Sequence, residues 1–197
     1  MKDVEVTRKK SICTFSGSSF GRKEEYVKEA VELGRLIGEN GLSLVYGGGS
    51  LGLMGAVARN ARESGAEVIG ILPEAMNKDY VVEGNVETTL LVVRDMHERK
   101  KLMYEKSDAF IALPGGIGTL EELFEIFTWK QLGYHVKPVV LLNVKNYFDH
   151  IISFLKHSVE EGFLTKEVFS SLHVAENAKD ALGMALSEER ESLPEKI

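Results

Sequence analysis

The sequence has few of the residues that mark secreted or membrane proteins. It contains one cysteine, Cys13, in 197 residues, which excludes an internal disulfide framework, and the apolar run around it predicts a buried, reduced thiol. No apolar run approaches the roughly 18 residues of a membrane span. The N-terminal segment MKDVEVTRKK is polar and has no signal-peptide core. We therefore expect a cytoplasmic protein.

Positive charge is also scarce. Lysine and arginine number 24 against 30 aspartate and glutamate, for a formal net charge of −6. A nucleic-acid backbone is bound through a basic field, so a polymeric nucleic acid is not an expected partner and a small ligand is. The five histidines show no metal-ligand spacing, and a single cysteine cannot complete a zinc site. We expect neither a metal nor a cofactor.

Strand-like and helical patterns alternate along the chain. A βαβα order predicts an α/β fold with a doubly wound parallel sheet flanked by helices. We see no repeats or linker and expect one nucleotide-binding domain over residues 1–197, with a polar, frayed tail at about 187–197. A short run at Leu172–Val174 is a candidate edge strand. The six expected strands are Ser11–Phe15, Leu42–Tyr46, Glu67–Leu72, Thr88–Val93, Asp108–Leu113 and Pro138–Leu142.

The most informative segment is PGGIGTLEE, Pro114–Glu122, between an expected strand and the amphipathic run Leu120–Leu132. Its glycines let an anion approach the backbone closely, and the free N–H groups of a first helical turn point toward such an anion. A turn of this kind binds phosphate. Two carboxylates follow Thr119 directly, which indicates chemistry on the bound ligand in addition to binding.

An earlier glycine turn, GGGSLGLMG at Gly47–Gly55, follows the second expected strand. It matches the GxGxxG pattern, and Glu74 follows the next strand about 20 residues on, where a dinucleotide-binding fingerprint has its acidic residue. The pattern alone leaves three interpretations open: NAD binding, contact with a phosphate or ribose, and a tight turn needed only for packing. A Walker-type site is excluded because no Gly-Lys-Ser/Thr follows either turn.

Loops at the carboxyl ends of parallel strands meet at one edge of a sheet, so these turns are expected to surround one crevice with Ser16–Gly21 and Leu72–Gly84. The Gly17–Gly21 segment also matches the GxSxG pattern of serine hydrolases. It follows the first strand, and no downstream aspartate and histidine stand at telling positions, so we interpret it as a ligand-contacting turn.

Arg99 interrupts an apolar helical stripe formed by Met96, Leu102 and Met103. Asp95 and Glu98 have capping-box spacing, so a helix is expected to begin here. A buried guanidinium needs an anionic partner, because burying it unpaired costs several kcal/mol. That partner is either a ligand or, in the alternative interpretation, a side chain in an internal salt bridge. An arginine that extends along its stem to solvent is a further alternative.

Glu122 begins a second apolar line on the later helix, continued by Ile126 and Trp129 at positions i+4 and i+7. A helix that is apolar on two faces is expected to be covered twice, by its own sheet and by a second subunit. The alternative for Glu122 is local, since Thr119 and Glu122 also have capping-box spacing, in which the glutamate only accepts the Thr119 N–H.

Three segments in combination resemble a known family. They are YGGGSLGLMG (46–55), MHERK (96–100) and PGGIGTLEE (114–122), followed by TWKQLG (128–133). Their order and spacing resemble the Lonely Guy family of cytokinin riboside 5′-monophosphate phosphoribohydrolases, often labelled lysine decarboxylases. The resemblance extends from about Ser11 to Leu164. No lysine stands in a recognisable setting for a Schiff base with pyridoxal phosphate, so the decarboxylase label has no support in the residues.

The resemblance implies a Rossmann-like homodimer that hydrolyses the N-glycosidic bond of a nucleoside 5′-monophosphate, N6-substituted AMP or AMP, with Arg99 and Glu122 as catalytic residues. The family usually has an acidic residue near the purine, and its position in this sequence falls near Val81, which departs from that pattern. Glu74, Asp79 and Glu83 are the nearby candidates. The rival expectation is a non-catalytic nucleotide or molybdenum-cofactor carrier, which needs the glycines but not the Arg99 and Glu122 pair. The implied substrate-binding residues are Gly115, Gly116, Ile117, Gly118, Thr119, Met96, Lys100, Thr128, Ser18, Gly48 and Ser50.

Overall fold

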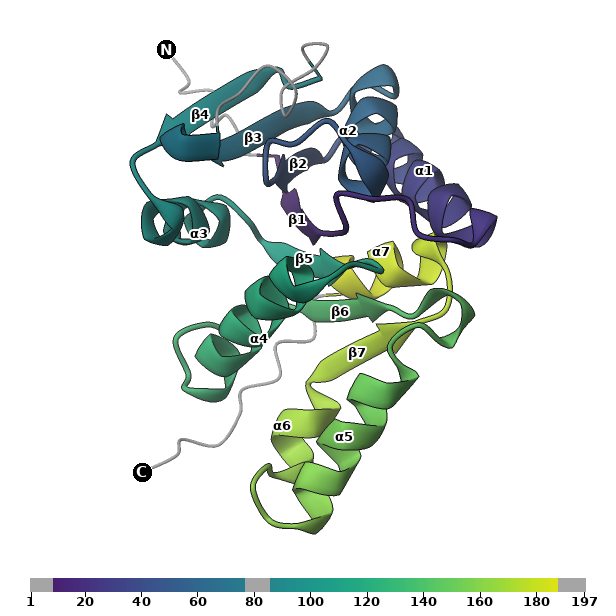
Figure 1. The fold of residues 1–197 in the computed structure, drawn as a ribbon, viewed down its shortest axis with the longest axis vertical. Coiled ribbons are helices and arrows are strands. Elements are labelled where there is room, and N and C mark those ends of the chain that lie inside the picture. Colours follow the sequence, from purple (N-terminus) through teal and green to yellow (C-terminus); the bar gives the residue numbers. More distant parts are fainter. Residues whose placement is uncertain (1–8, 77–85, 188–197) are drawn as a thin grey trace, which may run out of the picture.

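A computed structural model describes residues 9–76 and 86–187 of the chain (Figure 1). The strands are β1 (Ser11–Phe15), β2 (Ser43–Tyr46), β3 (Glu67–Pro73), β4 (Thr89–Val93), β5 (Ala109–Ala112), β6 (Val139–Leu142) and β7 (Leu172–Ala175). The helices are α1 (Glu24–Glu39), α2 (Gly52–Glu63), η1 (Glu74–Met76), α3 (Met96–Glu105), α4 (Ile117–Gln131), η2 (Val144–Asn146), α5 (Asp149–Glu160), α6 (Lys166–Ser170) and α7 (Ala178–Leu186).

The seven strands form one parallel sheet in the order β4-β3-β2-β1-β5-β6-β7. The chain builds outward from β1 to β4, then crosses back so that β5 lies beside β1. The carboxyl ends of β1 and β5 therefore flank the point where the strand order reverses, which is where open α/β sheets bind ligands. The predicted α/β class and parallel, doubly wound sheet are confirmed.

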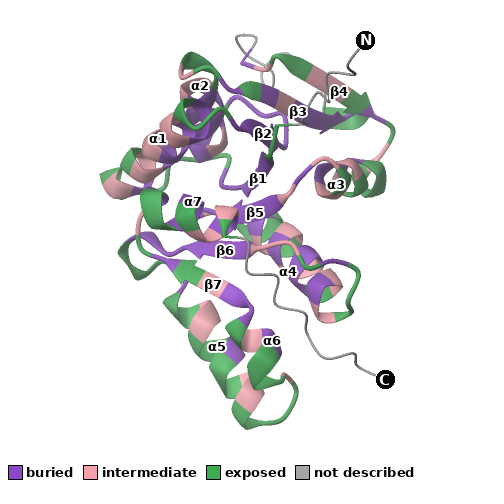
Figure 2. Cartoon of the chain, turned by 180° about the vertical axis from the view of Figure 1, so that it is seen from behind, coloured by how far each residue is buried: buried purple, intermediate pink, exposed green. Residues whose placement is uncertain are grey.

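Two helical layers cover the sheet. Helices α1, α2 and α7 pack on one face, whereas α3, α4, α5 and α6 supply the apolar side chains on the other (Figure 1). The central strands are buried from both faces, and α5 leaves most of its surface exposed (Figure 2). No helix in the described part of the chain combines the length and apolarity needed to cross a bilayer.

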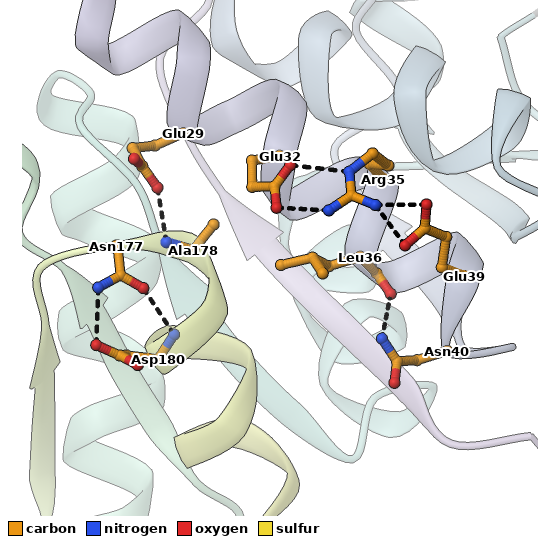
Figure 3. Close-up of polar contacts among 9 residues, drawn as sticks. All are labelled: Glu29, Glu32, Arg35, Leu36, Glu39, Asn40, Asn177, Ala178 and Asp180. Atoms are coloured by element: carbon orange, nitrogen blue, oxygen red, sulfur yellow. Dashed lines mark hydrogen bonds and ion pairs between the residues drawn. The ribbon is translucent and has the colours of Figure 1, made fainter.

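The polar surface of α1 joins it to the last helix of the same layer (Figure 3). Glu29 accepts a hydrogen bond from the Ala178 N–H at 2.7 Å, at the start of α7. Asn177 caps that helix by accepting from the Asp180 N–H at 2.9 Å. Both contacts satisfy donors that the first helical turn leaves unpaired. The Glu29 hydrogen bond also joins α7 to α1.

All six expected strands are present, with ends that differ by at most one residue from the predicted ones, and the short run at Leu172 forms the edge strand β7. The expected helix at Leu120 begins earlier, at Ile117. Glu74 lies in η1 and is exposed. Asp79, Val81 and Glu83 lie outside the described residues, as does most of the expected polar tail.

Candidate functional site

The crevice at the strand-order reversal is built from the loop after β1 and the glycine turn after β5. The Gly17 N–H donates to the Pro114 carbonyl at 3.0 Å and ties these loops together. Ser19, Phe20 and Gly21 from the first loop and residues 114–116 from the turn line a cavity of about 210 Å³, together with Tyr26, Leu53 and Tyr147. The cavity lies where the topology predicts a ligand.

The turn after β5 leaves the start of α4 open. Gly116 is the N-cap, and the first hydrogen bond of the helix runs from the Leu120 N–H to the Gly116 carbonyl at 3.2 Å. The N–H groups before Leu120 have no partner inside the helix. A Cβ added at Gly116 or Gly118 meets no atom within 4 Å, so no protein atom occupies the side-chain positions of these two glycines.

Thr119 packs under this turn. It is 3% exposed, and its Oγ1 lies 2.1 Å from where a Cβ at Gly115 would be. Only glycine therefore fits at position 115, and the threonine supports the turn from below.

The earlier turn, between β2 and α2, is filled by the protein itself. The first N–H groups of α2 are used, since Met54 donates to the Gly17 carbonyl at 3.2 Å and Leu53 to the Ser19 carbonyl at 3.4 Å. A Cβ at Gly55 would lie 1.8 Å from the Ser50 carbonyl oxygen. Close backbone packing, the third interpretation of this turn, accounts for these contacts.

Arg99 lies between the two turns. It is buried at 8% exposure, and its Nε donates to the Ile71 carbonyl at 3.1 Å. Nη1 pairs with Glu122 Oε1 at 2.6 Å, with 9% and 11% of the two side chains exposed. Nη2 lies 2.2 Å from where a Cβ at Gly47 would be. Gly47 therefore makes room for the guanidinium, and the salt-bridge interpretation of Arg99 is confirmed, with the other predicted catalytic residue as its partner.

Glu122 faces Arg99 and does not cap its own helix. The capping-box alternative with Thr119 is wrong, because the helix starts at Gly116 and Glu122 is already in its second turn. Burial raises the pKa of the Glu122 carboxyl, and the neighbouring Arg99 charge offsets this only in part. Arg99 thus lowers the pKa of Glu122, but burial is the larger effect and the net direction is upward. A raised pKa moves a carboxyl toward the range in which general bases work best.

Lys100 also joins α3 to α4, through carboxylates that are more exposed than Glu122. Its Nζ lies 2.5 Å from Glu121 Oε1 and 3.0 Å from Glu125 Oε1. Burial acts to lower the pKa of Lys100, but the two carboxylates outweigh it and the pKa is raised. Together with Glu122 and Glu125, Lys100 lines a cavity of only about 10 Å³ between α3 and α4. Lys100 thus pairs with carboxylates beside the site.

Two sequence expectations about α3 and α4 need correction. Met96 is not part of an inward stripe, because it is 44% exposed at the first position of α3, where its Sδ lies 3.9 Å from Arg99 Nη1. The second apolar line of α4 is covered within the chain. Ile126 is 3% exposed, and Trp129 packs edge-on against Tyr104 at 5.2 Å. The double apolar face of α4 therefore does not require a second subunit.

The remaining predicted binding residues divide by position. Ser18 is exposed on the β1 loop, and Ile117 is 83% exposed at the start of α4. Gly48 and Ser50 are buried in the earlier turn. Thr128 is exposed on α4, nine positions after Thr119, roughly 13 Å along the axis. The structure brings all of these except Thr128 to the crevice edge of the sheet, and their contacts with substrate stay predictions.

Two contributors to the site escaped the sequence reasoning. The Ile71 carbonyl at the end of β3 holds Arg99, and no sequence pattern marks a main-chain acceptor. Tyr147, in the loop after β6, donates to the Gly115 carbonyl at 2.5 Å. The sequence predicts the preceding strand β6, but the loop that carries Tyr147 contains no recognisable motif. Only the general tendency of carboxyl-end loops to meet at the crevice pointed to it.

Known proteins resemble the chain over most of its length. A family model described as "Possible lysine decarboxylase" matches residues 54–184. Cytokinin riboside 5′-monophosphate phosphoribohydrolase LOG3 of Arabidopsis thaliana is 45% identical, covering 91% of this chain and 83% of the relative. The phosphoribohydrolase LOG of Oryza sativa subsp. japonica is 46% identical, covering 88% of this chain and 72% of the relative.

Solved structures share the fold. The Moco carrier protein of Chlamydomonas reinhardtii aligns with a TM-score of 0.67 at 27% identity, covering 89% of this chain and 94% of that one. The molybdenum cofactor binding protein of Rippkaea orientalis aligns with a TM-score of 0.68 at 22% identity, over 90% and 95% of the two chains. The family match over most of the chain and the identity to the plant enzymes place this chain in the possible lysine decarboxylase family, among the cytokinin riboside 5′-monophosphate phosphoribohydrolases.

Proposed function

We propose that this protein hydrolyses the N-glycosidic bond of a nucleoside 5′-monophosphate, N6-substituted AMP or AMP, to the free base and ribose 5-phosphate. The observation that carries the proposal is the buried pair of Arg99 and Glu122, 2.6 Å apart, beside a glycine turn with an unfilled helix start. The names of its relatives support the same reaction.

The phosphate is assigned to the turn after β5. Its helix donors ahead of Leu120 are not used by the helix, and a helix start attracts negative charge through its partial positive charge. The earlier turn is the weaker candidate for phosphate binding, because the first N–H groups of α2 already donate to the carbonyls of Gly17 and Ser19. Gly48, Ser50 and Ser18 are then placed to line the crevice around the sugar, and Met96 and Lys100 its other side.

Glu122 is assigned the chemistry. Breaking a ribosyl bond develops positive charge at the anomeric carbon and ring oxygen, and a fixed carboxylate stabilises that charge. The same carboxylate orients water and accepts its proton as the oxygen bonds to the anomeric carbon. The bond to the base breaks, and the base gains a proton. The raised pKa of Glu122 brings it closer to the range in which general bases work best.

Arg99 is assigned to holding Glu122. Two parts of its guanidinium are engaged, Nε by the Ile71 carbonyl and Nη1 by Glu122, and the missing side chain of Gly47 leaves room for Nη2. A planar guanidinium held in this way fixes the carboxylate it pairs with. Proximity of a fixed carboxylate to the anomeric carbon is worth several orders of magnitude in rate.

The test is the release of free base from AMP, an N6-substituted AMP and adenosine by the purified protein. We expect base and ribose 5-phosphate in equal amounts from the monophosphates and far slower release from adenosine, which lacks the phosphate. No base from any monophosphate, with tight binding of a nucleotide or of molybdenum cofactor, would instead favour the carrier function of its structural relatives.

We further propose that the protein is a cytoplasmic homodimer. The exposed apolar side chains after α4, Leu132 at 53% and Val136 at 43%, support a subunit contact there. The buried, unpaired Cys13 suits a reducing compartment. Sedimentation at micromolar concentration tests the assembly, and a monomer would contradict it.

A further inference from the structure

Tyr147 contacts the phosphate turn from a distant part of the chain. It follows η2, is 40% exposed, and lines the cavity of about 210 Å³ beside Gly115 and Gly116. Its hydroxyl donates to the Gly115 carbonyl at 2.5 Å. The cavity wall is therefore joined to the turn by a side chain 32 residues away in sequence.

The backbone that presents Tyr147 is strained. Lys145 and Asn146 both adopt left-handed conformations, with φ of 52° and 63°. This region is unfavourable for a lysine, because its Cβ comes too close to the following carbonyl oxygen, whereas asparagine adopts it more readily. Such conformations persist only where the surrounding structure enforces them, and they concentrate at functional sites.

The surroundings of Tyr147 do enforce it. Its ring packs edge-on against Tyr26 at 5.6 Å and against Phe148 at 5.0 Å, and Phe148 is 1% exposed. Lys145 pairs with Glu25 at 3.3 Å, so the loop is also attached to α1. These contacts fix the ring and leave the hydroxyl directed at one acceptor, the Gly115 carbonyl.

The Gly115 carbonyl controls the direction of a donor in the turn. A peptide unit is planar, so the orientation of the Gly115 carbonyl sets that of the Gly116 N–H on the opposite side. Gly116 is exposed and has no protein atom within 4 Å of an added Cβ, and its own carbonyl accepts the Leu120 N–H. Gly17 fixes the preceding carbonyl, that of Pro114, and Tyr147 fixes the next one.

We infer that Tyr147 is a positioning residue for the phosphate turn: it locks the Gly115–Gly116 peptide so that the free donors before α4 face the 5′-phosphate. This inference rests on the proposed function for the identity of the ligand. It assigns Tyr147 to binding of the phosphate and not to the cleavage step, because it contacts Gly115 and not the Arg99 and Glu122 pair.

The test compares Tyr147→Phe, which keeps both ring contacts, with the matched control Tyr134→Phe, which removes a hydroxyl from a side chain that is 68% exposed. Calorimetry with ribose 5-phosphate measures affinity without turnover. Losing one hydrogen bond to the turn should raise the dissociation constant about five- to tenfold in Tyr147→Phe. Tyr134→Phe and the affinity for adenosine should not change.

Steady-state kinetics with AMP separate positioning from other roles. We expect the KM of Tyr147→Phe to rise by the same factor, with kcat within about twofold and the melting temperature close to wild type. Unchanged affinity for ribose 5-phosphate, a loss confined to kcat, or an equal loss for adenosine would overturn the inference. A wild-type protein that binds ribose 5-phosphate more tightly than Tyr147→Phe but releases no base would sink the proposed reaction and leave this inference standing.

Discussion

The two glycine turns look alike in sequence and differ in what surrounds them. In the turn after β2, an added Cβ would meet Arg99 at Gly47, Ser18 at Gly52 and the Ser50 carbonyl at Gly55. In the turn after β5, Gly116 and Gly118 meet nothing within 4 Å. Protein thus fills the space at these glycines of the first turn and at Gly115 of the second, where Thr119 Oγ1 lies 2.1 Å from an added Cβ, whereas the second turn leaves the space at Gly116 and Gly118 open.

The donors of the two helix starts differ in the same way. The first N–H groups of α2 bind carbonyls of the β1 loop, whereas the N–H groups of α4 ahead of Leu120 are not used by their helix. A glycine motif therefore does not identify an anion site by itself. The occupancy of the helix donors and the space over each glycine distinguish a packing turn from a binding turn.

The largest effect is expected at Arg99, whose guanidinium lies beside Gly47 of the turn after β2 and pairs with Glu122 of α4. Arg99→Ala leaves Glu122 buried without a partner, which costs about 3–5 kcal/mol of unfolding free energy, and should lower kcat/KM about 10³-fold. Denaturant unfolding and base-release kinetics measure the two effects. Lys100→Ala, whose carboxylate partners are more exposed, should cost at most about 1 kcal/mol. Equal costs for the two variants would contradict the account.

Gly55→Ala tests the packed turn. The new Cβ would lie 1.8 Å from a main-chain oxygen, which cannot move without shifting the start of α2. Overpacking of this kind typically costs about 1–3 kcal/mol, and we expect the upper end. Chemical denaturation gives the value. A melting curve that overlays the wild type would show that the turn is looser than described.

Gly47→Ala should separate catalysis from stability. Its Cβ would meet only the end of a flexible side chain, Arg99 Nη2 at 2.2 Å, so the guanidinium moves and the backbone does not. We expect kcat to fall at least about tenfold, because Glu122 loses its fixed partner, with less than about 1 kcal/mol of lost stability. Wild-type kcat in a folded Gly47→Ala protein would break the link between this glycine and catalysis.

The pH profile tests the state of Glu122. Burial raises the pKa of this carboxyl above its ordinary value of 4.5, and the proposed role needs the ionised form. Activity should therefore be lost as pH falls through the raised pKa, with kcat/KM dropping about tenfold per pH unit below it. Rates measured from pH 4 to 8, with circular dichroism to confirm folding, locate this limb. If kcat/KM stays constant down to pH 4.5, the reaction does not depend on the ionised form of Glu122.

The smallest effect is expected at the open turn. Gly118→Ala places a methyl group in empty space within α4 and should stabilise the protein by about 0.5–1 kcal/mol, because alanine favours a helix. The same methyl group crowds the phosphate, so the KM for AMP should rise several-fold. Thermal melts and initial rates check both parts. A stabilised variant with an unchanged KM would place the phosphate elsewhere.

Much of this architecture could be predicted from the sequence. Apolar periodicity located every strand of the sheet, because both faces of a parallel sheet are buried and its strands are apolar throughout. The misfit of Arg99 in its helix identified the residue that pairs with Glu122. The start of α4 was placed three residues late, because its first turn, Ile117–Thr119, has no apolar stripe and its N-cap is a glycine.

Other features depend on tertiary contacts that no local pattern encodes. The covering of Ile126 and Trp129 within the chain follows from the path of α3, and the sequence therefore pointed to a second subunit that those residues do not need. The net pKa direction of Glu122 depends on how far it is buried against how close Arg99 lies. The contact of Tyr147 with Gly115 joins loops that only the folded sheet brings together.

The central claim is that the carboxylate held by Arg99 acts on the sugar bound at the open turn, and Glu122→Gln tests it most directly. This change keeps the shape of the side chain and one acceptor oxygen for Arg99, replaces the other oxygen by an NH₂ donor, and removes the charge. We predict base release from AMP at least about 10²-fold slower than wild type, with ribose 5-phosphate bound at a similar affinity by calorimetry. Wild-type turnover by folded Glu122→Gln protein would contradict the account.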